Sequence, residues 1–142
     1  VTRLFDSFED TESIFLVLEY CDGGDFGDKI LERGAGVTEP EAASWVWQIL
    51  AAISCLHARY ICHRDVKPDN FMVAGAGVLK LSDFGLSVRL PRGQLLKEKC
   101  GTPAFMAPEQ HRLPHSPGYS LPVDVWAAGV SMYMVLLAGE HP

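Results

Sequence analysis

Two short apolar runs open the chain, separated by polar residues. The run at 14–20 reads Ile-Phe-Leu-Val-Leu-Glu-Tyr and is rich in β-favouring side chains, and residues 1–8 hold a weaker run before a polar turn. These runs predict two adjacent antiparallel strands. From Asp25 to about Arg33 the pattern predicts a short helix, which is ended by the glycine-rich segment that follows.

A long helix is predicted from Thr38 to about Ala58. Thr38 as the N-cap and Glu41 three residues later have the pattern of a capping box, and Pro40 lies in the first turn. Apolar side chains then recur at helical spacing, which predicts that one side of the helix faces the core. These side chains are Trp45, Ile49, Ala52, Ile53 and Leu56.

The second half of the chain predicts a hairpin, a long loop and a buried helix. Short strands at 71–73 and 78–81 are joined by Ala-Gly-Ala-Gly, and residues 83–119 predict a loop interrupted by a short helix at 108–111. Residues 125–138 have one polar side chain, so we expect a helix buried on nearly all sides. This run is shorter than the roughly 20 residues that span a bilayer, so no membrane span is expected.

Composition narrows the class of protein. The chain has 142 residues, 48% of them hydrophobic, with 12 basic against 18 acidic side chains and a net charge of −6. This composition excludes a disordered segment and offers no broad basic face, so nucleic acid is not an expected partner. Four scattered cysteines show neither zinc-site nor disulfide spacing, which favours an intracellular, cytoplasmic location.

A charged loop in the middle of the chain carries the candidate chemistry. Residues 63–70 read HRDVKPDN, and a DFG tripeptide follows thirteen residues later. Asn70 and Asp83 supply oxygen ligands that suit Mg²⁺, and Lys67 would neutralise phosphate oxygens. Asp65 would orient a hydroxyl or accept its proton. Together these side chains predict phosphoryl transfer.

These residues resemble the catalytic loop and the magnesium-binding motif of eukaryotic protein kinases. The pattern HRDxKPxN fixes six residue types, so a chance match is rarer than about one in 10⁷ per starting position. The segment at 101–109, GTPAFMAPE, resembles the end of a kinase activation loop, and residues 124–129, DVWAAG, resemble the start of the large buried helix.

The resemblance implies an α+β, protein kinase-like fold, mostly its helical large lobe. Residues 1–20 would be the end of the small lobe and the start of the hinge. Residues 21–142 would be the hinge and the large lobe up to its buried helix. We therefore expect an incomplete, two-lobed kinase domain rather than a small independent domain.

Roles for the motif residues follow from the same resemblance. Asp65 would be the catalytic base, Lys67 would contact the transferring phosphoryl group, and Thr102 would hydrogen-bond both. Asn70 and Asp83 would hold Mg²⁺ beside ATP. Because Lys67 and Thr102 are typical of Ser/Thr kinases, the expected substrates are proteins with serine or threonine acceptors.

The expected nucleotide contacts rest on less specific residues. In the resemblance, main-chain groups of Glu19 and Cys21 pair with adenine, and Met72 lies under the ring. Asp25 would contact ribose or a basic substrate side chain. A plain core strand would have the same pattern as the expected hinge. Asp25 also begins a second DFG tripeptide, for which a helix-capping or ligand-rim role is predicted in place of metal binding.

Two further expectations concern how the site is held. Leu4, His63 and Phe84 match positions that stack as a hydrophobic spine in kinases. Asp124 matches the aspartate that anchors the backbone of the catalytic loop. Each of the four would also fit an ordinary core position.

The expected activation loop has no hydroxyl side chain between Ser87 and Thr102. Glu98 occupies the place where many kinases carry a phosphorylated threonine. Our hypothesis is that Glu98 pairs with Arg64 and orders the loop by a permanent charge. The alternative is an ordinary solvated Lys-Glu-Lys face.

Two functional classes stay open. One is a Ser/Thr kinase, with a texture closest to the calcium/calmodulin-dependent and calcium-dependent kinase group. The other is a pseudokinase or truncated product that acts as a binding scaffold. Residues 1–142 hold no Gly-rich loop and no VAIK-type lysine, so we expect these residues alone to be inactive, with those motifs and any regulatory domains outside them.

Overall fold

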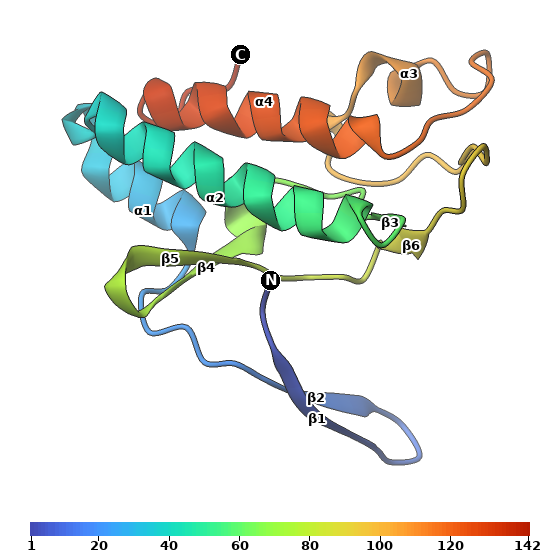
Figure 1. Ribbon diagram of the computed structural model, residues 1–142, viewed down its shortest axis with the longest axis horizontal. Helices are drawn as coiled ribbons and strands as arrows, with labels where there is room; N and C mark the ends of the chain where they lie inside the picture. The colour runs from blue at the N-terminus through green and yellow to red at the C-terminus, as the bar shows by residue number, and fades with distance from the viewer.

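The computed structural model describes all of residues 1–142. Helices α1, α2 and α4 lie together over the β4–β5 hairpin, whereas the β1–β2 hairpin projects away from them (Figure 1). The strands are β1 (Leu4–Glu9), β2 (Ile14–Leu18), β3 (Ile61–Cys62), β4 (Phe71–Ala74), β5 (Val78–Leu81) and β6 (Val88–Arg89). The helices are α1 (Phe26–Arg33), α2 (Glu39–His57), α3 (Pro108–His111) and α4 (Pro122–Leu136), with single 3-10 turns at 34–36, 68–70, 75–77 and 103–105. This mixture confirms the α+β class.

Helix α2 forms as its sequence predicts. The Glu41 carboxylate accepts hydrogen bonds from Thr38 N at 3.1 Å and from Thr38 Oγ1 at 2.9 Å, which closes the start of the helix. Its apolar side packs into the main core together with α1, α4 and the β4–β5 hairpin. The buried members of that side are Ile49, Ala52, Ile53 and Leu56, with Trp45 partly buried beside them.

The β4–β5 hairpin is antiparallel and has one buried face. Phe71 pairs with Leu81 and Val73 pairs with Leu79, and all four side chains are buried while their neighbours along the strands are not. This alternation of two residues is what a strand covered on one face requires. The hairpin therefore seats the preceding loop, residues 63–70, against the core.

Helix α4 is less buried than its sequence predicts. Its buried side includes Asp124, Ala128 and Val135, but Trp126 is 49% exposed and Met132 is 42% exposed. Within residues 1–142 the helix packs against α2 and the turn at 103–105, which cover only one side. No helix of the structure combines the length and the apolar character needed to cross a lipid bilayer.

One strand pair was not predicted. Ile61 and Cys62 of β3 pair with Val88 and Arg89 of β6 in an antiparallel bridge of two residues each. Such short strands leave no alternation to detect, and their partners lie 26 to 28 positions apart. This pair brings the start of the long loop at 83–119 back to the residues that precede the loop at 63–70.

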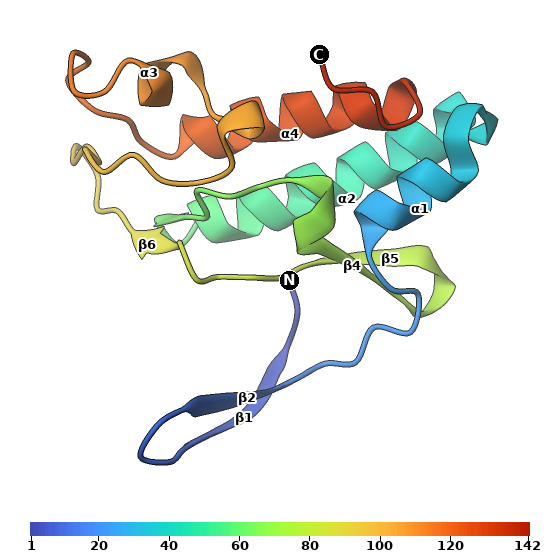
Figure 2. The same cartoon turned by 180° about the vertical axis from the view of Figure 1, so that it is seen from behind.

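The β1–β2 hairpin confirms the two predicted N-terminal strands but leaves its apolar side chains uncovered. Phe8 and Phe15 stack at 5.9 Å across the two strands, and both views show the hairpin away from the helices (Figures 1 and 2). Leu4 is 54% exposed. The expected stacking of Leu4 with His63 and Phe84 is therefore wrong for this structure, because nothing in residues 1–142 covers the hairpin.

Candidate active site

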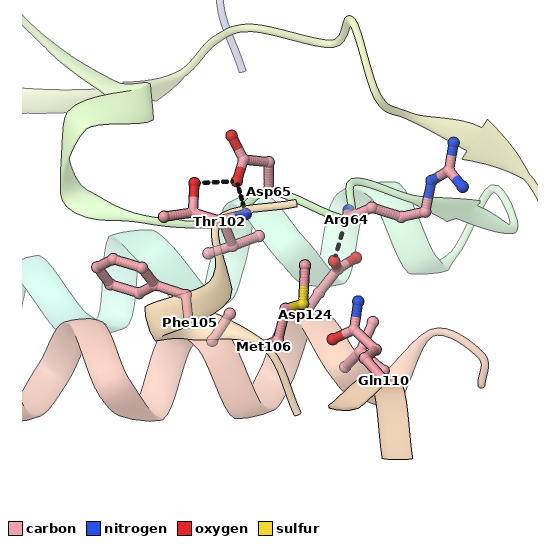
Figure 3. Close-up of a pocket in the computed structure, with 10 residues that line it drawn as sticks. Arg64, Asp65, Thr102, Phe105, Met106, Gln110 and Asp124 are labelled. Atoms are coloured by element: carbon pink, nitrogen blue, oxygen red, sulfur yellow. Dashed lines mark hydrogen bonds between the residues drawn. The ribbon is translucent and has the colours of Figure 1, made fainter. Parts of the chain in front are cut away.

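Asp124, in the first turn of α4, anchors the backbone of the candidate catalytic loop. Its carboxylate accepts hydrogen bonds from His63 N at 2.8 Å, from Arg64 N at 2.9 Å and from His57 Nε2 at 2.9 Å. Asp124 is 1% exposed, so these donors replace the water that a buried carboxylate would otherwise need. The expected anchoring contact is present, and Figure 3 shows its Arg64 bond.

The Asp65 carboxylate is held from two sides. Its Oδ1 accepts hydrogen bonds from Thr102 N at 2.8 Å and from Thr102 Oγ1 at 2.7 Å, both drawn in Figure 3. Its Oδ2 accepts one from Asn70 Nδ2 at 3.0 Å. Thr102, 37 positions along the chain, and Asn70, five positions along, thus fix the Asp65 carboxylate. Its Oδ2 atom keeps room for a further hydrogen-bond donor.

Lys67 completes a triangle with Asp65 and Thr102. Its Nζ donates to Thr102 Oγ1 at 2.9 Å and lies 3.4 Å from Asp65 Oδ2. Burial opposes the charge on Asp65, but the hydrogen bonds from Thr102 and Asn70, with the Lys67 ammonium, outweigh it and lower the pKa of the Asp65 carboxyl. The Asp65 carboxyl group is consequently ionised, and it is oriented to accept a further hydrogen bond.

Asn70 is buried and turned so that its amide nitrogen serves the loop. Nδ2 donates to the Asp65 backbone oxygen at 2.6 Å as well as to the Asp65 carboxylate, while Oδ1 accepts no hydrogen bond from the protein. The amide orientation follows from this network. The Oδ1 atom therefore remains available to a cation.

Asp83 follows β5, and its neighbour Ser82 is hydrogen-bonded to the backbone of Asn70. Ser82 donates to the Asn70 backbone oxygen from N at 2.8 Å and from Oγ at 2.9 Å. Asp83 itself is exposed, with φ 54°, and its side chain accepts only from Gly85 N at 3.2 Å. No hydrogen bond joins the side chains of Asp83 and Asn70, and no cluster of three or more His, Cys, Asp or Glu side chains could hold a metal ion.

His63 ties the segment around Asp83 to the loop. The buried His63 ring contacts the Ser82 backbone oxygen through Nε2 at 3.0 Å and meets the Phe84 ring edge-on at 5.1 Å. Two of the three expected spine residues are thus in contact. Their effect is to hold the backbone on both sides of Asp83, although its carboxylate stays free.

The expected hinge residues leave main-chain groups unpaired. Glu19 N donates to Arg3 O at 2.8 Å, but Glu19 O accepts only a long contact from the Cys21 thiol at 3.9 Å, and Cys21 N donates to no protein atom. The Glu19 side chain pairs with Lys80 at 3.1 Å, and this hydrogen bond lowers the pKa of the Glu19 carboxyl. The backbone oxygen of Glu19 and the backbone N–H of Cys21 are therefore an acceptor and a donor without strong partners, two residues apart.

Asp25 and Met72 lie side by side where the hinge meets α1. The two residues form an isolated antiparallel bridge, and both are partly buried. The Asp25 carboxylate caps α1 by accepting from Asp28 N at 3.1 Å, which confirms the predicted capping role of the second DFG tripeptide. Nucleotide contacts by either residue stay a prediction.

The expected activation loop is ordered by Arg64. Its Nη1 lies 3.0 Å from Glu98 Oε2, and its Nε donates to Leu86 O at 2.6 Å. The hypothesised Arg64–Glu98 pair is therefore present. Tyr119, whose hydroxyl donates to Glu98 O at 2.7 Å, was not predicted, because no local pattern links residues that lie 21 positions apart.

The space between the catalytic loop and α4 is almost filled. A cavity of about 10 Å³ remains, lined by side chains of the loop, the segment after the activation loop and α4 (Figure 3). Such a volume holds at most one water molecule. Side chains therefore fill this region and support Asp65 from the α4 side.

Comparison with known proteins agrees with this arrangement of residues. A model of the protein kinase domain matches residues 1–142. The chain is 40% identical over 145 residues to the mouse phosphorylase b kinase gamma catalytic chain, liver/testis isoform, and 41% identical over 145 residues to rice calcium-dependent protein kinase 9. It is 40% identical over 144 residues to CBL-interacting serine/threonine-protein kinase 8 of Arabidopsis thaliana.

These matches include all of this chain but only part of each relative. The matched region is 35% of the phosphorylase b kinase chain, 24% of the rice kinase and 31% of the Arabidopsis kinase. The relatives include Ser/Thr kinases and a calcium-dependent kinase, as the resemblance implied. With its motifs, its fold and a match along its whole length, the chain belongs to the protein kinase domain family.

Proposed function

We propose that the protein containing this chain is a Ser/Thr protein kinase that transfers the γ-phosphoryl group of ATP to serine or threonine hydroxyls of proteins. The observation that carries the proposal is the triangle of Asp65, Lys67 and Thr102, with Asn70 on the other carboxylate oxygen of Asp65. The relatives, which include a serine/threonine-protein kinase, support the same class.

The reaction we propose uses the free side of the Asp65 carboxylate. Oδ2 accepts one hydrogen bond, from Asn70, so a substrate hydroxyl can donate to the same atom. Asp65 orients this hydroxyl and accepts its proton as the new O–P bond forms and the bond from the γ-phosphorus to ADP breaks. Lys67 places its positive charge beside the transferring group, while Thr102 keeps Lys67 and Asp65 in position.

Asn70 and Asp83 fit a hard cation such as Mg²⁺. Asn70 offers an amide oxygen with no other partner, and Asp83 offers an exposed carboxylate. Bound Mg²⁺ would neutralise phosphate charge on ATP. Two protein ligands suit Mg²⁺, which usually completes its shell with water and substrate phosphates.

For the nucleotide we propose contacts at the hinge. Glu19 O and Cys21 N form the acceptor and donor that an adenine edge requires, and neither has another strong partner. Met72 would lie against the ring and Asp25 near the ribose. All four cysteines are free thiols, which supports an intracellular location for such an enzyme.

The test is phosphoryl transfer from radiolabelled ATP to a mixed Ser/Thr peptide library, with the protein at its full natural length. Asp65→Asn should reduce transfer at least about a hundredfold, because the carboxylate is lost while the hydrogen-bonding shape stays. Asp69→Asn is the matched control, since Asp69 is exposed in the same loop and its side chain makes no hydrogen bond. Equal transfer by wild type and Asp65→Asn would favour the scaffold alternative.

A further inference from the structure

Tyr119 makes the hydrogen bonds that join the segment at 94–100 to the chain just before α4. Tyr119 and Leu96 exchange two backbone hydrogen bonds, of 2.8 and 2.9 Å. The Tyr119 hydroxyl then reaches two residues further and donates to Glu98 O at 2.7 Å. Tyr119 is 2% exposed, so its ring is also part of the core formed with Cys62 and Val123.

A thiol extends this attachment toward the active site. Cys100 Sγ lies 3.6 Å from the Tyr119 hydroxyl oxygen. Because the hydroxyl proton is directed at Glu98 O, the Cys100 thiol is the donor in this second contact. Burial raises the pKa of Tyr119 to about 12, so the hydroxyl keeps the proton that it donates to Glu98 O.

Only Gly101 separates Cys100 from Thr102. Gly101 has φ 105°, and a Cβ there would lie 2.3 Å from Arg64 O, so the segment lies directly against the catalytic loop at this point. Thr102 follows with its two hydrogen bonds to Asp65. A shift at residues 98–100 would consequently move the donors that orient the Asp65 carboxylate.

We propose that Tyr119 is a positioning residue for phosphoryl transfer, which acts through Glu98 and Cys100 to hold Thr102 on Asp65. The proposal rests on the proposed kinase function. Arg64 pairs with the exposed Glu98 side chain and Tyr119 donates to the Glu98 backbone, and the Arg64 guanidinium also lies beside the Tyr119 hydroxyl. Tyr119 touches neither Asp65 nor Thr102 and exerts its effect along the chain.

Gly118 gives a second, independent way to disturb the same attachment. Its φ is 125°, and a Cβ there would lie 2.6 Å from Leu96 O. Any side chain would therefore separate Tyr119 from Leu96 while leaving the tyrosine ring and hydroxyl unchanged. Gly118→Ala should reproduce the effect of Tyr119→Phe if the attachment matters.

The experiment compares Tyr119→Phe and Gly118→Ala with Tyr133→Phe, at the full natural length of the protein. Tyr133 lies on α4, is 40% exposed and makes no side-chain hydrogen bond, so it is the matched control. Hydrogen exchange measured by mass spectrometry follows residues 94–102, α2 and α4 separately. Iodoacetamide labelling followed by peptide mapping measures the reactivity of the Cys100 thiol.

We expect faster exchange at 94–102 and faster labelling of Cys100 in both variants, with α2 and α4 unchanged. One net hydrogen bond corresponds to about a fivefold to tenfold change, so kcat should fall by about that factor, with the KM for ATP within about twofold of wild type. Tyr133→Phe should match wild type throughout.

Two results would overturn the proposal. One is exchange and labelling in Tyr119→Phe equal to those of Tyr133→Phe. The other is faster exchange spread equally over α2 and α4, which would mean that Tyr119 only contributes to general stability. If the wild-type protein transfers no phosphate, the kinase function fails, and exchange and labelling still decide whether Tyr119 holds the segment.

Discussion

The two aspartates of the active site are held in opposite ways. Asp65 accepts three hydrogen bonds from Thr102 and Asn70 and lies beside the Lys67 ammonium. Asp83 is exposed and its side chain bonds only to Gly85, two residues away. The proposed catalytic base is therefore held by contacts within the chain, whereas the proposed metal ligand has its backbone fixed and its exposed carboxylate bonded only to a near neighbour.

This difference separates two kinds of contribution. Contacts around Asp65 stabilise the fold and prepare the site together, so changes there should affect both stability and catalysis. The exposed Asp83 carboxylate, whose one hydrogen bond comes from Gly85 two residues away, contributes little to folding, and its main value would lie in binding a cation. Substitutions of Asp83, Asp124, Thr102 and Glu98 can test whether the contributions to stability and to catalysis separate in this way.

Asp83→Asn should give the largest loss of activity with almost no loss of stability. The substitution removes a charge but keeps a residue type that tolerates φ 54°. We expect phosphoryl transfer to fall about a thousandfold or more, because metal binding is worth several kcal/mol, while Tm stays within about 2 °C of wild type. Steady-state kinetics against Mg²⁺ concentration measures the transfer rate, and calorimetry measures Tm. A large fall in Tm would contradict the prediction that Asp83 contributes little to folding.

Asp124→Ala should show the opposite pattern and destabilise the fold. It leaves the buried His63 and Arg64 amides without acceptors, and we expect the free energy of unfolding to drop by about 3 kcal/mol or more. Urea unfolding followed by circular dichroism gives the change. Asp28→Ala, on the exposed side of α1, serves as the control; similar unfolding of both variants would show that Asp124 does not anchor the loop.

Thr102→Ala should reduce kcat about tenfold and shift its pH dependence. The pKa of Asp65 is lowered in the folded protein, so activity that needs the carboxylate is present above that pKa and is lost as pH falls through it. Removing the Thr102 hydroxyl raises this pKa and moves the acid limb of the profile to higher pH. Thr102→Ser should restore wild-type behaviour, and an acid limb that moves to lower pH would refute the assignment.

Glu98→Gln should have the smallest effect. The Glu98 side chain is 73% exposed, and exposed ion pairs contribute about 0.2–1 kcal/mol, so activity and protection of the loop should change at most about fivefold. The change should shrink at high salt, because salt screens the Arg64–Glu98 attraction. Glu32→Gln on α1 is the control. If Glu98→Gln leaves the hydrogen-exchange protection of the loop unaltered at low salt, residues 97–99 are an ordinary solvated Lys-Glu-Lys face.

Local patterns predicted the elements well and the long-range contacts poorly. The capping box of α2 and the apolar spacing of Ile49 and Ile53 depend on neighbours within one or two turns, and both appear in the structure. The β3–β6 pair and the Tyr119–Glu98 bond join residues more than twenty positions apart, and nothing near either partner marks them. The catalytic loop was identified from its fixed combination of charged residues, which few other structures require.

Two predictions about burial were wrong: the nearly complete burial of α4, which followed from its apolar composition, and the packing of Leu4, which followed from the kinase resemblance. An apolar run shows that a helix or strand can be covered, but it does not show which side is covered within a given stretch of chain. Trp126 on α4 and Leu4 on β1 are exposed because residues 1–142 place nothing against them. The positions of Glu19, Cys21, Met72 and Asp25 agree with the expected hinge, whose contacts with nucleotide stay predictions.

The contact between Asp124 and the loop backbone has a consequence for the newly made chain. Arg64 leaves the ribosome long before its partner, since 60 residues separate the two. At about 5–20 residues per second, the loop waits about 3–12 seconds for the carboxylate that fixes it. During that interval the loop at 63–70 lacks the acceptor for its His63 and Arg64 amides, so a chain released early, or a stall before α4, would yield the whole motif without this anchor.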